Sequence, residues 1–180
     1  SSFDEIETIE FSGASKTATF TSLQMTGETL SLSETVAGTS NLIIDVGSGE
    51  TATFQNITAT SSFTSGTDTI TINGSTGNET IIGPNINSTI SGGIGNDTIT
   101  GGTEDDTISG QAGADSLTGG SGNDTYIFNT NDVETGETIT EASNGGTDIV
   151  SIITNTDFGN MSASSFDEIE TIEFSGASKT

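Results

Sequence analysis

The side chains best suited to do chemistry in this sequence are carboxylates that recur every nine residues in its middle. Between positions 74 and 127, six nine-residue copies follow one another without insertion: GSTGNETII, GPNINSTIS, GGIGNDTIT, GGTEDDTIS, GQAGADSLT and GGSGNDTYI. The sixth position of the copies is, in order, Glu79, Ser88, Asp97, Asp106, Asp115 and Asp124. An acid at this position in five of the six copies, set among glycines, is a pattern of oxygen ligands for a hard cation.

The glycines around each acid give the backbone the freedom that a metal-binding loop needs. They tolerate positive φ angles, so a tight turn can aim several carbonyl oxygens to one side while the carboxylate closes over them. Calcium takes six to eight such oxygens in a tolerant geometry at about 2.3–2.6 Å, whereas magnesium demands a tighter octahedron. The spacing therefore predicts calcium binding.

Composition excludes most other chemistry. The chain has 26 acidic and two basic residues and a net charge of −24, so nucleic acid and anionic membranes are not expected partners. Because there is no His or Cys, a histidine-bearing triad, a thiol nucleophile, a disulfide and an ordinary zinc site are excluded. The sequence also has no G-x-S-x-G elbow of a lipase. We expect no enzyme activity in this chain.

The six copies resemble the RTX family, whose template is G-G-x-G-x-D-x-U-x, with U an apolar residue, and whose nonapeptides form a parallel β-roll. The resemblance covers residues 74–127. It implies that two copies make one coil, so that each copy stacks on the next but one. It also implies that an ion between two stacked copies takes carbonyl oxygens from positions 2 and 4 and the acid of one copy. The other copy supplies the carbonyls of positions 1 and 3 and its acid.

Carried over to this sequence, the family pattern implies about three calcium ions. The first site is formed by Gly93, Gly95, Asp97, Gly110, Ala112 and Asp115. The second is formed by Gly102, Glu104, Asp106, Gly119, Ser121 and Asp124, with Glu104 at a usual glycine position, where it strains the turn or adds a ligand. The third is formed by Ser75, Gly77, Glu79, Gly92, Ile94 and Asp97. The pair of Ser88 and Asp106 is expected to be weak or empty, because its first copy lacks the acid.

The apolar residues predict the elements that must position these loops. Ile81, Ile90, Ile99, Ile108, Leu117 and Tyr126 occupy the eighth position of the copies, and each is flanked by polar residues, as in a short half-buried strand. We expect an all-β fold, a right-handed parallel β-roll continuous with β-solenoid or β-sandwich flanks. Because one inward side chain per copy buries little apolar surface, calcium binding and folding of the roll should be coupled.

A longer repeat frames the nonapeptides. Residues 1–17, SSFDEIETIEFSGASKT, recur without a difference at residues 164–180, so the sequence holds one unit of 163 residues and the opening of the next, as in a tandem array. We expect a β-rich flank at 1–73, the roll at 74–127, a post-roll β segment at 128–163 and the next unit from 164. Wound at 18 residues per coil throughout, a unit would extend roughly 40 Å.

Three acids or acid groups outside the copies have a plainer interpretation. Asp68 in GTDTI and Asp148 in GGTDIV echo the motif, but each stands alone, which favours a surface turn over a metal ligand. Glu5, Glu7 and Glu10 alternate with isoleucines, as on the solvated face of a strand.

Two functions remain open. The tandem unit and the acidic roll favour a calcium-stabilised structural repeat of an extracellular bacterial surface-layer, filament or sheath protein, whose partners are calcium and neighbouring units in a filament or lattice. The RTX resemblance implies type I secretion and the cell surface. The alternative is an adhesin module that binds a glycan, another cell or ice, because the triplets at Thr51–Thr53, Thr58–Thr60 and Thr69–Thr71 could form a threonine ladder. No run of apolar residues long enough for a transmembrane helix is present.

Overall fold

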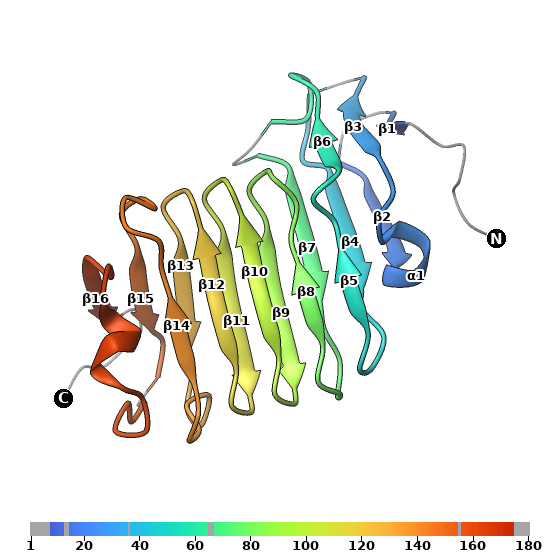
Figure 1. The fold of residues 1–180 in the computed structure, drawn as a ribbon. Helices are drawn as coiled ribbons and strands as arrows, with labels where there is room; N and C mark the ends of the chain where they lie inside the picture. The colour runs from blue at the N-terminus through green and yellow to red at the C-terminus, as the bar shows by residue number, and fades with distance from the viewer. Residues whose placement is uncertain (1–7, 13–14, 36, 65–66, 155, 175–180) are drawn as a thin grey trace.

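The protein is a stack of parallel β-strands wound into a solenoid, seen in a computed structural model that describes residues 8–12, 15–35, 37–64, 67–154 and 156–174 (Figure 1). This confirms the predicted all-β fold with a parallel β-roll. The strands are β1 (Thr8–Phe11), β2 (Thr17–Thr21), β3 (Leu30–Glu34), β4 (Asn41–Asp45), β5 (Thr51–Thr53), β6 (Ile57–Ala59), β7 (Thr69–Asn73), β8 (Thr80–Ile82), β9 (Thr89–Ile94), β10 (Thr98–Gly102), β11 (Thr107–Ala112), β12 (Ser116–Gly120), β13 (Thr125–Phe128), β14 (Thr138–Thr140), β15 (Ile149–Ile152) and β16 (Thr171–Phe174).

Three sheets form the sides of the solenoid. The eight-stranded sheet has the order β16-β15-β13-β11-β9-β7-β4-β2, the five-stranded sheet β14-β12-β10-β8-β5 and the three-stranded sheet β1-β3-β6. Two single helical turns complete the coils, α1 (Ser22–Met25) and η1 (Ala163–Phe166). The segment after α1 stacks on β5, where Gly27 N donates to Thr53 O at 2.9 Å, and η1 contacts β14. No helix among the described residues is long and apolar enough to span a membrane.

The cross-section changes along the solenoid. From β3 to β8 each coil passes through all three sheets, and stacked residues such as Ser40 and Asp68 are 28 positions apart. From β9 to β14 the chain alternates between only two sheets, and stacked residues such as Ser88 and Asp106 are 18 apart. Beyond the roll the spacing grows to 24, between Asp124 and Asp148. The prediction of 18 residues per coil throughout is therefore wrong outside the roll.

The N-terminal flank, residues 17–73, is solenoid and not sandwich. Its strands β2, β4 and β7 pair in parallel and continue the eight-stranded sheet, in which β7 pairs with β9 of the roll (Figure 1). One hydrophobic core runs through both regions. In the flank it contains large side chains from all three sides, including Met25, Leu32, Phe54 and Phe63.

In the roll the core consists of one apolar side chain per copy, contributed alternately by the five-stranded and the eight-stranded sheet. The six apolar residues at the eighth positions of the copies all have at most 1% of their surface exposed, which confirms their predicted inward direction. After each of the first five, the next buried position along the chain is glycine, and a Cβ atom at Gly83, after β8, would lie 2.8 Å from Ile90 Cδ1 of β9. At Gly93 and Gly95 the φ angles are +107° and +134°, and a Cβ atom would lie within 2.2 Å of a carbonyl oxygen of the previous coil. These two positions of the turn therefore require glycine.

Candidate metal centre

The strand register brings the acids of the copies into two columns, as the sequence predicts. Thr98 pairs with Thr80 and Ser116, and Thr107 pairs with Thr89 and Thr125, so each copy stacks on the next but one. Hydrogen bonds join the residues of each column into what we call a ladder. The first ladder contains Glu79, Asp97, Asp115 and Glu137, and the second contains Ser88, Asp106, Asp124, Asp148 and Glu170.

Every rung of the ladders is the same hydrogen bond. One carboxylate oxygen accepts from the backbone N–H of the ladder residue one coil earlier: Asp97 Oδ1 from Glu79 N at 2.7 Å, and Asp115 Oδ1 from Asp97 N at 2.7 Å. In the second ladder, Asp124 Oδ1 accepts from Asp106 N at 2.8 Å. This bond fixes the side chain and leaves the other oxygen of each carboxylate free for a different partner.

Those second oxygens are buried, and no hydrogen-bond donor reaches them. They are Asp97 Oδ2, Asp106 Oδ2, Asp115 Oδ2, Asp124 Oδ2 and Glu137 Oε1. A buried carboxylate oxygen without a partner is costly, so a native protein rarely retains one without a ligand. Five of them in two regular columns point to a repeated function.

Glycine leaves room beside these oxygens. A Cβ atom at Gly92 would lie 2.4 Å from Asp97 Oδ2 and 2.7 Å from the carbonyl oxygen of Gly110 in the next coil. In the second ladder, a Cβ atom at Gly101 would lie 2.5 Å from Asp106 Oδ2 and 2.7 Å from the carbonyl oxygen of Gly119. A free carboxylate oxygen and a carbonyl oxygen thus converge on the same open space in both ladders.

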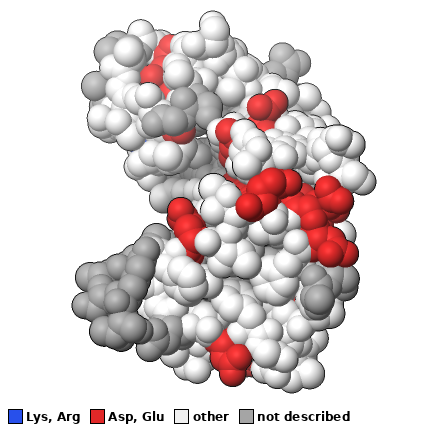
Figure 2. Space-filling view, turned by 90° about the vertical axis from the view of Figure 1, so that its left-hand side faces the viewer, with Lys and Arg blue, Asp and Glu red and all other residues white. Residues whose placement is uncertain are grey.

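The electrostatics favour a cation in that space. Burial raises the pKa of Asp106 and of Asp115 to about 6, of Asp124 to about 7 and of Glu137 to about 8, and neighbouring carboxylates add to the rise. Among the described residues the basic side chain is Lys16, exposed before β2. Further acids lie on the outer surface, as Figure 2 shows for the side on which β16 lies. The donor set, all carboxylate and carbonyl oxygen, suits calcium.

The structure brings the predicted site residues together in unequal ways. In the first and second sites, Asp97 and Gly110, and likewise Asp106 and Gly119, converge as described above. The carbonyl oxygens of Ala112, Gly102 and Ser75 each accept a backbone hydrogen bond, from Gly95, Ser121 and Ile94 respectively, so one lone pair of each is engaged. Glu104 has an exposed side chain and no positive φ angle, so the turn there is not strained.

The third predicted site differs because both carboxylate oxygens of Glu79 accept hydrogen bonds from backbone N–H groups. Its Oε1 accepts from Gly49 N at 2.7 Å and Gly77 N at 3.1 Å, and its Oε2 accepts from Ser75 N at 3.0 Å. The extra methylene of Glu lets the carboxylate reach back into its own turn. Both oxygens are therefore satisfied without a cation. At the expected weak pair, Asp106 Oδ1 accepts from both the backbone and the hydroxyl of Ser88 at 2.8 Å.

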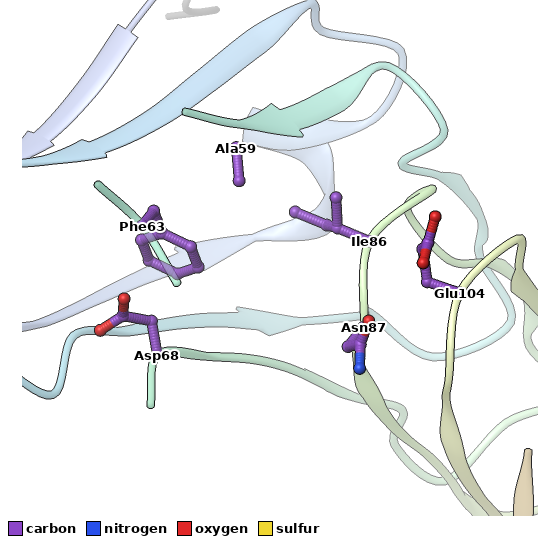
Figure 3. A pocket seen from close by; sticks show the side chains of 6 residues that line it. All are labelled: Ala59, Phe63, Asp68, Ile86, Asn87 and Glu104. Carbon is purple, nitrogen blue, oxygen red and sulfur yellow. The ribbon is translucent and has the colours of Figure 1, made fainter. Parts of the chain in front are cut away.

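Two expectations about isolated acids are wrong. Asp148 is buried and belongs to the second ladder. The nine-residue spacing does not predict this, because 24 residues separate Asp148 from Asp124, six more than a pair of copies. Asp68 is buried as well: it accepts from Ser40 N and Thr64 N and borders a cavity of about 160 Å³ with Phe63, Ile86 and Glu104 (Figure 3). Glu10 is exposed as predicted, while Glu5 and Glu7 lie outside the described residues.

Sequence reasoning missed a further set of rungs at the fifth position of the copies. The side chain of Asn78 accepts from Asn96 N at 3.0 Å, and that of Asn96 from Ala114 N at 3.1 Å. Asp105 and Asn123 repeat the arrangement on the other side of the roll. The recurrence of Asn next to the acid in GNE and GND was the available signal.

Comparison with known proteins identifies the repeat. The family model of the RTX calcium-binding nonapeptide repeat (4 copies) matches residues 73–103 and 91–126. No curated protein and no solved structure matches the chain. The matched residues contain both ladders from Glu79 to Asp124.

Proposed function

We propose that this chain, which belongs to the RTX calcium-binding repeat family through residues 73–126, is a calcium-stabilised structural unit of an extracellular bacterial surface-layer, filament or sheath protein. RTX repeats bind calcium and are typically structural parts of secreted proteins. The observation that carries the proposal is the regular array of carboxylates in the two ladders. In each of Asp97, Asp106, Asp115 and Asp124, Oδ1 accepts from a backbone N–H group, whereas the buried Oδ2 has no donor.

The ladders suggest where about three ions bind. One is held by Gly93, Gly95 and Asp97 with Gly110, Ala112 and Asp115, and one by Gly102, Glu104 and Asp106 with Gly119, Ser121 and Asp124. For the third, the pair of Asp115 and Glu137 is better suited than the predicted pair of Glu79 and Asp97. Asp115 Oδ2 and Glu137 Oε1 are both buried and unpartnered, whereas both oxygens of Glu79 are engaged.

The calcium requirement suits a protein that folds after export. Stacked carboxylates about 4.8 Å apart repel one another without a cation, so the roll should remain unfolded where calcium is scarce, as in the cytosol. It should fold on meeting the higher calcium concentration outside the cell.

The repeated 17-residue segment supports a tandem array. The sequence TIEF forms both β1 and β16: β1 pairs with β3, which follows it, and β16 pairs with β15, which precedes it. The two pairings use opposite edges of the strand, so one copy of TIEF can make both at once. Phe11 of β1 is 4% exposed and packs on Phe63 with ring centroids 5.8 Å apart, whereas the identical Phe174 of β16 is 58% exposed. In an array the next unit would cover Phe174 as Phe63 covers Phe11.

Three measurements test the structural role. Circular dichroism should show strand content that falls on chelation and returns with calcium, and unchanged spectra would refute a metal-dependent fold. A chain of two 163-residue units should have about twice the longest dimension of one unit in small-angle X-ray scattering with calcium. Electron microscopy of concentrated material should show filaments or a lattice; dispersed particles would instead favour a simple binding module.

A second candidate function, recognition of an ordered surface such as ice, is favoured by the outer face of the five-stranded sheet. The three threonine triplets predicted as one ladder lie on three different sheets, so that ladder does not form. Register instead aligns a hydroxyl in every strand of the five-stranded sheet, from Thr51 through Thr80, Thr98 and Ser116 to Thr138. Inhibition of ice recrystallisation that is lost in Thr98→Tyr and kept in the exposed control Thr130→Tyr would support this function.

A further inference from the structure

Three carboxylates meet where the last nonapeptide joins the segment that follows the roll. They belong to Asp124, which precedes β13, Glu141, which follows β14, and Asp148, which precedes β15. One oxygen from each lies within 4.8 Å of the others. Glu141 and Asp148 stand outside the residues that match the repeat family, and Glu141 is not a rung of either ladder.

The oxygens of this group are held in position and incompletely satisfied. Asp124 Oδ1 accepts from Asp106 N, and Asp148 Oδ1 accepts from Asp124 N, both at 2.8 Å. Glu141 Oε1 accepts from the hydroxyl of Tyr126 and from Gly119 N. Asp124 is fully buried, and its Oδ2 has no donor, nor has the buried Oε2 of Glu141.

Glycines open the space around these oxygens. A Cβ atom at Gly119 would lie 2.2 Å from Asp124 Oδ2 and 2.5 Å from Glu141 Oε1. A Cβ atom at Gly145 would lie 2.9 Å from the carbonyl oxygens of Gly120 and Ala142 and 3.5 Å from Glu141 Oε2. Carboxylate and carbonyl oxygens therefore border the same region, and these are the ligands that calcium prefers.

We propose that Asp124, Glu141 and Asp148 bind an additional calcium ion that lies outside the nonapeptide pattern. The ion would join the last coil of the roll to the longer coil that follows it, because its ligands come from both. The inference rests on the proposed calcium-dependent function, since it assumes a protein folded with calcium in its ladders. It assigns Glu141 a ligand role that no fixed repeat spacing gives it.

Native mass spectrometry of the full chain with increasing calcium tests the proposal by counting bound ions. Glu141→Gln keeps the size of the side chain and an oxygen for Tyr126, and it should bind one ion fewer than the wild type. The matched control is Glu134→Gln, an exposed acid of the same segment, which should bind the wild-type number. A wild-type count in Glu141→Gln would overturn the additional site alone, whereas a wild-type chain that binds no calcium would overturn the proposed function.

Terbium, a luminescent substitute for calcium, gives a second measurement that needs no change at Glu141. Tyr126 is the single Tyr of a chain without Trp, and its hydroxyl contacts Glu141, so it should sensitise an ion bound there. Asp106→Asn removes a ligand of the neighbouring nonapeptide site and leaves the three carboxylates intact. Sensitised emission that survives in Asp106→Asn, at half the wild-type amplitude or more, supports the proposal. Loss of the emission in this variant, folded by circular dichroism, would overturn it.

Discussion

The roll and the N-terminal flank share one sheet and one core, yet they are stabilised in different ways. In residues 17–73 each coil has three sides and encloses large side chains such as Leu32, Phe54 and Phe63. In the roll each coil has two sides and encloses one apolar residue per copy, and four carboxylate oxygens of the roll are buried without donors. In the described part of the flank, the buried carboxylate oxygen without a donor is Glu34 Oε1.

This difference shows how coil length sets the source of stability. A coil of about 28 residues has an interior wide enough for a hydrophobic core. A coil of 18 residues encloses only one apolar side chain from each of its two sheets, such as Ile90 of β9 and Ile99 of β10. The shorter coil therefore depends on what lies between its turns, where the carboxylates and carbonyl oxygens converge.

Removal of calcium should separate the two regions most strongly. At a free calcium concentration 100 times Kd, each bound ion adds about 2.7 kcal/mol of stability, so loss of several ions should unfold the roll. Hydrogen exchange with and without chelator should show loss of amide protection in β9 to β13 and retained protection in β3 and β4. Equal loss in both regions would show that the flank depends on calcium as much as the roll.

A cavity in the flank should give the reverse result. Leu32→Ala removes a side chain with no exposed surface, and should lower the free energy of unfolding by about 2–5 kcal/mol. Because Leu32 lies on β3, which pairs with β1 and β6 and carries no ladder residue, denaturant unfolding should show this loss while calcium affinity stays unchanged. The control is Leu23→Ala, whose side chain is 84% exposed and whose change should stay within about 0.5 kcal/mol.

Within the roll, the rungs should differ in their effect on calcium. Asp97→Ala combined with Asp115→Ala removes both acids of one predicted site, and should weaken calcium affinity at least about tenfold, or roughly 1.4 kcal/mol. Ser88→Ala should have a much smaller effect, because Ser88 offers a hydroxyl that is already bonded to Asp106. Calorimetric titration measures both, and equal effects would contradict the assignment of the ladders.

The effect of pH should be the smallest of the four, and it is expected in the chain without calcium, whose carboxylates are free to bind protons. The pKa of Asp106 and Asp115 is raised to about 6 and that of Asp124 to about 7, above the ordinary value near 4, so the folded chain without calcium binds more protons than the unfolded chain. Its stability should therefore be greatest below pH 4 and fall as pH rises through 6 to 7.

Thermal unfolding in chelator between pH 4 and pH 8 measures this fall. Because calcium competes with protons for the same carboxylates, its affinity should rise over the same range. A chelated protein that becomes more stable from pH 4 to pH 8 would contradict the buried, unpaired state of these acids.

The sequence predicts the roll well because its period is fixed. Nine-residue spacing gives the inward residues, such as Ile99 and Ile108, and the stacking of alternate copies. It fails at Asp148 and Glu137, because the coils beyond the roll contain 24 and 22 residues and the ladder continues while the spacing does not. It does not reveal that both oxygens of Glu79 accept backbone hydrogen bonds, from Gly49 of the previous coil and from its own turn, because spacing carries no information about the reach of a side chain.

The passage from three sides to two has a mechanical consequence for any array of such units. Each 163-residue period would contain a wide segment with a hydrophobic core and a narrow segment held together by bound metal. The cross-section of the fibre would therefore vary at regular intervals. Under tension the narrow segments would respond to the calcium concentration of the surroundings, while the broad ones would keep their shape.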